Sequence, residues 1–276
     1  MPPGTAARRP PDSERIELWC AFLADIDAAQ RWAEYPALLD AEERRRGQRL
    51  RMSADRRRHL AARALARTVL SRYSPVAPRE WVFEPDAQGR PRIRAPQPAP
   101  VEFNIAHSGE LVVLAVGAGG ALGVDVEYQQ RHTDTVKLER YFAPAECAAL
   151  GALGGAARRR RFFELWTLKE AYLKARGVGL RLPLGGFAFD LTEPGALALS
   201  FTGVFADQST RWAFAQLTLR EQYVVAVCAE RRAAQSLQLA VHEAVPLAEQ
   251  RRVSAQLSRA AHFTVAEGGP AQRSGG

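Results

Sequence analysis

Two acidic residues in the middle of the chain have the type and spacing of metal ligands. Asp125 and Glu127 lie in the segment GVDVE, residues 123–127. Alternate side chains of a strand point to opposite faces, so both carboxylates project from one face, about 7 Å apart along the backbone. Like charges this close need a cation, and oxygen ligands without nearby His or Cys favour Mg²⁺ or Mn²⁺ over Zn²⁺. The alternative is the exposed polar face of an edge strand, which an isolated pair of this kind fits more often.

A second charged group lies in the apolar segment FFELWTLKEAYLK, residues 162–174. On a helix, Glu170 and Lys174 are neighbours one turn apart, on the face that also carries Trp166. A surface salt bridge would explain the pair, although such a pair contributes only about 0.3–0.5 kcal/mol. A third metal-binding carboxylate, with an ammonium beside it for phosphate oxygens, explains better why charges stand beside an aromatic residue in so apolar a helix.

Positive charge is concentrated in one part of the chain. The chain has 38 Lys and Arg against 30 Asp and Glu, a formal charge of +8, and residues 42–67 hold ten arginines with three acids. A positive surplus favours anionic partners, which could be nucleic acid, a membrane or a phosphorylated metabolite. A solvated helix face and an anion-binding site explain the arginine run equally well.

His107 stands in the segment FNIAHSG, where a strand gives way to a turn. A lone histidine is usually structural, and no Ser, His and Asp order in the chain supports a hydrolase triad. Beside an arginine-rich helix, however, His107 could donate a hydrogen bond to a phosphate.

Hydrophobic periodicity and turn residues predict the elements that must position these side chains. Strands are expected at residues 16–22, 101–105, 111–116 and 121–128, a hairpin at 212–219 and 223–229, and helices at 40–70, 143–150 and 158–176. The proline-rich residues 85–100, which include Gly89-Arg90-Pro91, are expected to form a loop. Residues 237–261 are expected to add a helix, and 268–276 to be disordered.

A weak internal repeat predicts two related α+β halves. At an offset of 111 residues, five positions of the two hairpins are identical, among them Phe103 with Phe214 and Val113 with Val224. We therefore expect an α+β fold of two similar subdomains, each with an antiparallel sheet and a long helix, and a ligand in the cleft between them. The expected subdomains are residues 14–130 and 131–232, with a partly disordered extension at 233–276. Five identities among hydrophobic strands could also arise by chance.

The cysteines and the apolar runs indicate where the protein works. Three widely spaced cysteines offer neither a disulfide framework nor a CxxC metal cluster, which fits a reducing cytosol. No apolar run approaches the roughly 20 residues of a spanning helix, and residues 1–13 do not resemble a secretory signal. A cytoplasmic protein with no membrane partner is expected.

Four motifs in order give the chain a family resemblance. GVDVE is followed some 40 residues later by WTLKEAYLK, and it is preceded by FN-x-x-HS and, earlier still, by GRP. Over residues 40–190 this order resembles the 4'-phosphopantetheinyl transferases of the larger, pseudo-dimeric type that activate surfactin synthetase. The resemblance implies transfer of the phosphopantetheine arm of coenzyme A to a serine of an apo acyl or peptidyl carrier protein, with release of 3',5'-ADP by a monomer.

The resemblance also implies roles for individual residues. Mg²⁺, or Mn²⁺, would be held against the coenzyme A diphosphate by Asp125, Glu127 and Glu170. Lys174 would stabilise developing charge on the transferred phosphate or the leaving group, and Glu170 or a metal-bound water would take the serine proton. Phosphates of the cofactor would be contacted by His107, Arg90, Arg51, Arg63 and Lys169, with Arg51 and Arg63 at the 3'-phosphate. The family usually has Ser or Thr directly before the histidine, and this chain has Ala106. The hydroxyl contact to the cofactor is therefore absent, and the resemblance implies greater reliance on backbone N–H groups or neighbouring arginines.

Two other functions are compatible with the residues. A non-enzymatic protein could use the arginine helix to bind nucleic acid, with binding that weakens steeply as salt increases. A Mg²⁺-dependent phosphodiesterase or nucleotidyl transferase would consume a nucleotide without any carrier protein. With the transferase as the leading interpretation, no nucleic acid partner is expected.

Overall fold

The computed structural model describes residues 11–95, 101–179, 182–202, 207–232 and 236–266. The chain forms two compact units. Unit 1 comprises Met1–Gly119, Leu239–Ala255 and Val265–Gly276, and unit 2 comprises Gly120–Gln238 and Gln256–Thr264. Each unit contains its own sheet and its own long helix, so the predicted α+β fold with two similar subdomains is confirmed.

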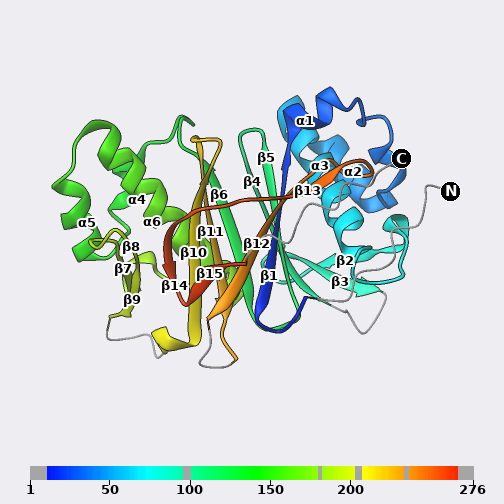
Figure 1. Ribbon diagram of the computed structural model, residues 1–276. Helices are drawn as coiled ribbons and strands as arrows, with labels where there is room; N and C mark the ends of the chain where they lie inside the picture. Colours follow the sequence, from blue (N-terminus) through cyan, green and yellow to red (C-terminus); the bar gives the residue numbers. More distant parts are fainter. Residues whose placement is uncertain (1–10, 96–100, 180–181, 203–206, 233–235, 267–276) are drawn as a thin grey trace. The chain divides into compact units, whose positions relative to one another are not determined.

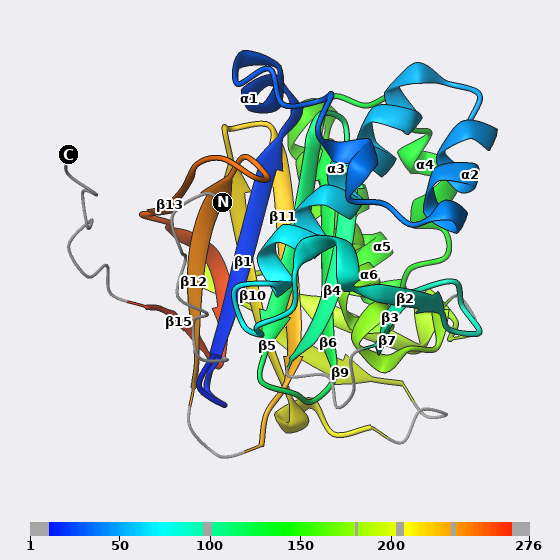
Figure 2. The same ribbon diagram turned by 90° about the vertical axis from the view of Figure 1, so that its right-hand side faces the viewer.

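The sheet of unit 1 is built around the predicted strand at the start of the chain. Its strand order is β13-β12-β1-β5-β4. The strands are β1 (Arg15–Phe22), β4 (Glu102–Ser108), β5 (Leu111–Gly117), β12 (Leu237–Ala244) and β13 (Gln250–Val253). β5 is buried along its whole length, because it pairs with β1 on one side and β4 on the other and is covered by helix α3 (Ser53–Leu70). Figure 2 shows α3 lying across these strands.

The helical region predicted at residues 40–70 is two helices. α2 (Ala41–Arg49) begins at a capping box, in which the Asp40 side chain accepts from the Glu43 amide and the Glu43 side chain accepts from the Asp40 amide. It ends where Leu50 becomes extended, and α3 begins three residues later. α3 buries an apolar stripe of Ala and Leu against the sheet, together with Trp19 and Trp81 in one core.

The expected loop at residues 85–100 contains a strand. β2 (Val82–Pro85) pairs antiparallel with β3 (Pro91–Ala95) in a separate two-stranded sheet, and residues 96–100 lie outside the described part. Pro85 pairs with Pro91 at the end of this ribbon, where the missing N–H groups cost no ladder hydrogen bond. Gly89 supplies the positive φ of the turn.

The sheet of unit 2 has the order β6-β11-β10-β14-β8. Its strands are β6 (Leu122–Tyr128), β8 (Gly195–Ala196), β10 (Trp212–Leu219), β11 (Tyr223–Glu230) and β14 (Leu257–Ala261). Helix α6 (Gly155–Arg176) lies along β6 and β11 (Figure 1). Its apolar side chains share a core with Phe187 and Phe214. The predicted helices and the predicted hairpin of this unit are confirmed.

The remaining elements are short. They are α1 (Leu23–Ala28), α4 (Thr135–Glu139), α5 (Pro144–Gly151), the pair β7 (Phe187–Asp190) and β9 (Ala198–Phe201), β15 (Phe263–Val265), and the 3₁₀ turns Tyr35–Ala37, Pro78–Glu80, Leu184–Gly186 and Ser209–Arg211. No helix within the described ranges combines the length and the apolar character that a membrane crossing requires.

The segment expected to add a C-terminal helix forms strands instead. Residues 237–261 contain β12, β13 and β14, which pair with strands of the two sheets. The units therefore differ from the expected subdomains 14–130, 131–232 and 233–276. The first boundary lies before β6, because β6 pairs with β11, and the expected extension supplies strands to both units. The disorder expected at residues 268–276 falls outside the described residues.

The two hairpins do not superpose over their whole length at the 111-residue offset. In the first hairpin Phe103 pairs with Val116, and in the second Phe214 pairs with Cys228 rather than with Val227. The second turn is one residue longer, and a one-residue slip moves a strand's side chains to the opposite face. The two halves share an architecture. The identical residues on the second strand of each hairpin, β5 and β11, do not occupy equivalent positions in the pairing register.

Candidate active site

The two acidic residues of GVDVE lie on the face of β6 against which α6 packs. Asp125 and Glu127 are both buried, and Gly123 lies on the same face by the strand period. A Cβ at Gly123 would stand 2.0 Å from the Ala171 carbonyl oxygen and 2.5 Å from the Ala175 amide nitrogen, both backbone atoms of α6. Glycine therefore permits the close approach that brings the α6 side chains Glu170 and Lys174 toward the carboxylates of β6.

Replacing this glycine should move the helix. We expect Gly123→Ala to lower the free energy of unfolding by about 3 kcal/mol, because rigid backbone atoms cannot yield to the added methyl group. Urea denaturation measures the change. Gly151→Ala is the control, since nothing lies within 4 Å of a Cβ there. Equal stability of the two variants would show that α6 does not need this approach.

Asp125 is paired with Lys174 through one of its two carboxylate oxygens. Lys174 Nζ donates to Asp125 Oδ1 at 2.6 Å and to the Val124 carbonyl oxygen at 3.1 Å. Asp125 Oδ2 is buried and makes no hydrogen bond within the described residues. Burial raises the pKa of Asp125, and the nearby Lys174 ammonium only partly offsets this effect. A buried carboxylate oxygen without a donor is an available ligand for a cation.

Glu170 is electrostatically coupled to Asp125. Its pKa is raised by partial burial and by the negative charge of Asp125, against a smaller opposing effect of Lys174. Glu127, in contrast, is paired with Arg131, whose Nη1 donates to Glu127 Oε2 at 2.8 Å. Each carboxylate of β6 thus has a cationic partner from the chain itself.

The three carboxylates are not gathered into a ready ligand cluster. Among the residues that the structure describes, no three His, Cys, Asp or Glu side chains are arranged to hold a metal ion. The contacts supply a physical reason: like charges repel, and here Lys174 and Arg131 neutralise Asp125 and Glu127 separately. The three predicted ligands, Asp125, Glu127 and Glu170, lie at the interface of α6 and β6, but their carboxylates do not surround a common position for an ion.

Lys169 does not belong to the site, which corrects the expectation that it contacts a phosphate. Its side chain is 0% exposed, and Nζ donates to the carbonyl oxygens of Leu184 (2.8 Å) and Phe187 (2.7 Å) and pairs with Glu146 Oε2 at 2.7 Å. All three ammonium donors are used inside the core, so none is left for a ligand. Trp166 packs on Phe142 and Phe162.

The other predicted ligands of coenzyme A lie in unit 1. Arg51 is exposed between α2 and α3, and Arg63 lies 3.6 Å from Glu43 Oε1. Arg90 donates to the Phe103 carbonyl oxygen of β4 at 2.8 Å, and burial lowers its pKa to about 10. His107 is exposed on β4. Arg90 and β4 are therefore in contact, whereas Arg51 and Arg63 belong to the helical layer.

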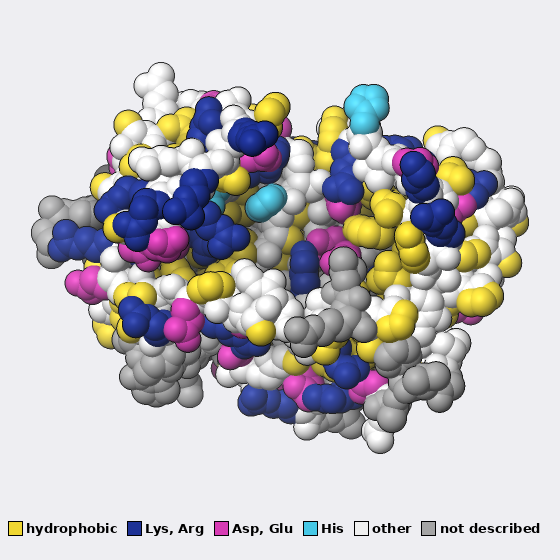
Figure 3. Space-filling view, turned by 180° about the vertical axis from the view of Figure 1, so that it is seen from behind, with side chains coloured by type: hydrophobic (Ala, Val, Ile, Leu, Met, Phe, Trp, Pro, Cys, Tyr) yellow, Lys and Arg dark blue, Asp and Glu magenta, His cyan; other side chains and the backbone are white. Residues whose placement is uncertain are grey.

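Much of the arginine surplus is already neutralised. Arg67 is fully buried and donates to Glu43 at 2.5 Å and to the Trp81 carbonyl oxygen, so it is a core residue. Arg57 pairs with Asp27 and Arg45 with Glu42. Figure 3 shows the Lys and Arg side chains of this region, over α2 and α3, with acidic side chains among them. Part of the run is therefore structural or paired on the surface.

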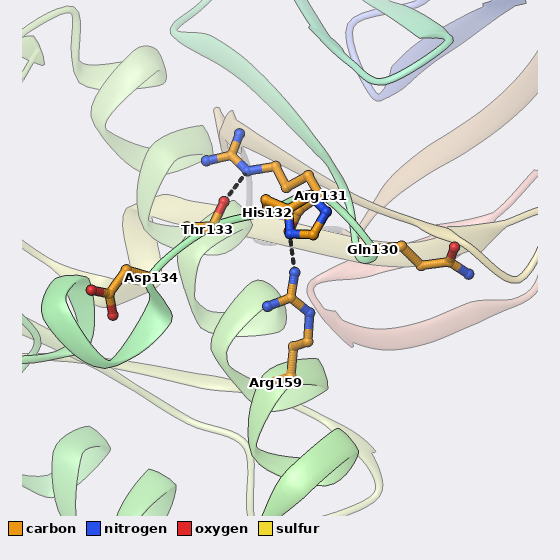
Figure 4. Close-up of a pocket in the computed structure, with 6 residues that line it drawn as sticks. All are labelled: Gln130, Arg131, His132, Thr133, Asp134 and Arg159. Carbon is orange, nitrogen blue, oxygen red and sulfur yellow. Dashed lines mark hydrogen bonds between the residues drawn. The ribbon is translucent and has the colours of Figure 1, made fainter.

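Sequence reasoning missed a cationic pocket after β6. A cavity of about 560 Å³ is lined by Gln130, Arg131, His132, Thr133, Asp134 and Arg159 (Figure 4). Arg159 donates to the carbonyl oxygens of Gln129 and Arg131, which fixes the loop to α6. The only signal in the sequence is the pair Arg131-His132, four residues after the strand's last carboxylate.

Known proteins similar to this chain decide its family. A phosphopantetheinyl transferase of Thraustochytrium is 35% identical over 235 residues, which is 79% of this chain and 80% of that protein. The chain belongs to the 4'-phosphopantetheinyl transferase family. The 4'-phosphopantetheinyl transferase psf-1 of Bacillus pumilus is 29% identical over 77% of the chain and 88% of its own length, and a 4'-phosphopantetheinyl transferase of Bacillus subtilis is 31% identical over 70% and 83%.

Two family models divide this transferase as the structure does. The model of the 4'-phosphopantetheinyl transferase superfamily matches residues 121–228, within unit 2, and the model of the N-terminal region of 4'-phosphopantetheinyl transferases matches residues 27–118, within unit 1. The chain is thus an enzyme of the larger type, which transfers the phosphopantetheine group of coenzyme A to carrier proteins. The nucleic-acid and phosphodiesterase alternatives are not favoured.

Proposed function

We propose that this transferase moves the 4'-phosphopantetheine arm of coenzyme A to a serine of an apo acyl or peptidyl carrier protein and releases 3',5'-ADP. The proposal rests on the interface of β6 and α6. There the buried Asp125 accepts a hydrogen bond from Lys174, and burial together with the negative charge of Asp125 raises the pKa of Glu170. We further propose that the enzyme acts as a monomer in the cytoplasm.

The oxygen donors at this interface are of the kind that a hard divalent cation prefers, although the described residues do not gather three of them around one point. Asp125 Oδ2 is buried without a hydrogen bond to the described residues, and the nearby groups are carboxylates. Asp125, Glu127 and Glu170 would hold Mg²⁺ or Mn²⁺. When bound, the ion supplies positive charge that neutralises the diphosphate oxygens of coenzyme A.

The chain's own residues perform the proton and charge steps. The serine Oγ attacks the phosphorus that carries the pantetheine arm, the bond from that phosphorus to the bridging oxygen of 3',5'-ADP breaks, and the serine proton passes to Glu170. A serine hydroxyl attacks only when its proton has an acceptor, and the Glu170 carboxylate would supply one. Lys174 stabilises the charge that develops on the phosphoryl and leaving oxygens, because an ammonium in a partly buried site is little screened.

Residues of unit 1 are proposed to bind the cofactor's phosphates. Arg51 and Arg63 would contact the 3'-phosphate, and Arg90 and His107 the remaining phosphates. Ala106 is buried in β4 and offers no hydroxyl group, so the cofactor contact expected there falls to neighbouring donors.

The role of Arg63 can be separated from general charge. We expect Arg63→Ala to raise the KM for coenzyme A about tenfold more than the KM for 3'-dephospho-coenzyme A, because only the former presents the 3'-phosphate. Steady-state kinetics with both substrates measure the ratio. Arg45→Ala removes an exposed arginine of α2 and serves as the control. Equal effects of Arg63→Ala on the two substrates would reject this assignment.

The transferase activity itself is tested by mass. The protein is incubated with coenzyme A, Mg²⁺ and an apo carrier protein, and the intact carrier is weighed. Addition of the phosphopantetheine arm, absent when the carrier serine is replaced by alanine, supports the proposal. Consumption of coenzyme A without a change in carrier mass would contradict it.

A further inference from the structure

Arg131 forms an ion pair with Glu127 from the solvent-exposed edge of the site. The Glu127 side chain is 7% exposed, whereas that of Arg131 is 40% exposed, and the two meet at 2.8 Å. Each of the two cations has a second acceptor: Lys174, whose side chain is 29% exposed, also donates to the Val124 carbonyl oxygen, and Arg131 also donates to Thr133 Oγ1. Between Lys174 and Arg131, the arginine is the more exposed.

The backbone of the loop that contains Arg131 is fixed, whereas the Arg131 guanidinium borders an open cavity. Arg159 of α6 donates to the carbonyl oxygens of Gln129 and Arg131, which anchors the backbone. In the same arrangement Arg131 Nε donates to Thr133 Oγ1 at 2.7 Å, and the Arg131 side chain borders the cavity that His132 and Asp134 also line (Figure 4). The guanidinium can leave Glu127 by side-chain rotation while its root stays in place.

We propose that Arg131 is the resident counter-ion of Glu127, which a divalent cation must displace toward the cavity that His132 and Asp134 also line in order to bind. This inference rests on the metal site of the proposed function. In the exchange, the ion pair between Arg131 and Glu127 breaks and a contact between Glu127 and the cation forms. Arg131 thereby sets the cation concentration at which the site fills. Its guanidinium both occupies a Glu127 oxygen and repels the incoming ion.

Direct cation binding tests the proposal without relying on turnover. Mn²⁺ is titrated into the full-length protein with saturating coenzyme A and no carrier, and bound Mn²⁺ is followed by electron paramagnetic resonance. We expect Arg131→Gln to tighten Mn²⁺ binding about fivefold. Arg160→Gln removes the same charge from an exposed position of α6 and is expected to leave the affinity unchanged. Unchanged or weaker binding by Arg131→Gln would overturn the inference.

Asp125→Asn distinguishes failure of the inference from failure of the site. If Asp125→Asn loses Mn²⁺ and Arg131→Gln does not tighten it, the metal site stands and Arg131 is not its competitor. If the wild type and Asp125→Asn bind Mn²⁺ equally, the proposed metal site fails and the inference fails with it.

Discussion

Asp125→Asn is expected to reduce kcat/KM for carrier modification at least about a thousandfold while leaving the fold intact. The substitution keeps the size of the side chain but removes the charge that Lys174 neutralises, and it can replace the buried oxygen that accepts no hydrogen bond from the described residues. Loss of preorganised charge at a phosphoryl-transfer site typically costs this much. Carrier mass measured over time gives the rate, and circular dichroism confirms the fold.

The control for this prediction is an acid of the same unit outside the site. Glu193→Gln removes an exposed carboxylate and should retain wild-type turnover. If Asp125→Asn kept more than a tenth of the wild-type activity, the carboxylate of β6 would have no direct part in the reaction, and the site would have to be sought elsewhere.

Lys169→Met is expected to lower the free energy of unfolding by about 3–5 kcal/mol. The change leaves Glu146, whose side chain is 1% exposed, without its cation, and it deprives the Leu184 and Phe187 carbonyl oxygens of their donor. Removing one partner of a buried ion pair has this cost, because the remaining charge stays in a desolvated position. Urea denaturation followed by tryptophan fluorescence measures it.

A double variant separates the charge from the packing. Glu146 Oε2 also accepts from the Ala143 amide and Oε1 from the Phe189 amide, so a neutral glutamine can keep part of this bonding. Lys169→Met with Glu146→Gln should therefore recover a substantial part of the lost stability. If the double variant is less stable than Lys169→Met alone, charge burial is not the cause of the loss.

Elements with a clear local pattern could be predicted from the sequence. Residues 16–22, the hairpin at 212–229 and helix α6 were identified because their hydrophobic periods are set by one buried face. β12 and β14 were missed and a helix was expected, because Leu and Ala dominate the segment and its strand state depends on pairing with distant strands. Residues 40–70 were recognised as helical, but the break at Leu50 was missed, because its signal is a single glycine, Gly47, inside an otherwise helical pattern.

The candidate site was predicted in part for the same reason. The strand period placed Asp125 and Glu127 on one face, and the helical period placed Glu170 and Lys174 one turn apart, and both arrangements are local. The burial of Lys169 depends on Glu146 and on the carbonyl oxygens of residues 184 and 187, which no local pattern reveals. The pairing of Arg131 with Glu127 depends on the path of a loop that Arg159 fixes.

The strands after residue 236 belong to both units, so the enzyme cannot be divided into two shorter chains by a single cut. A plasmid that encodes only residues 1–119 would lack β12 and β13, and one that encodes only 120–232 would lack β14, so each product would expose an unpaired sheet edge prone to aggregation. Chimaeras between relatives should therefore exchange the sequence after residue 236 strand by strand, with each strand following the sheet it completes.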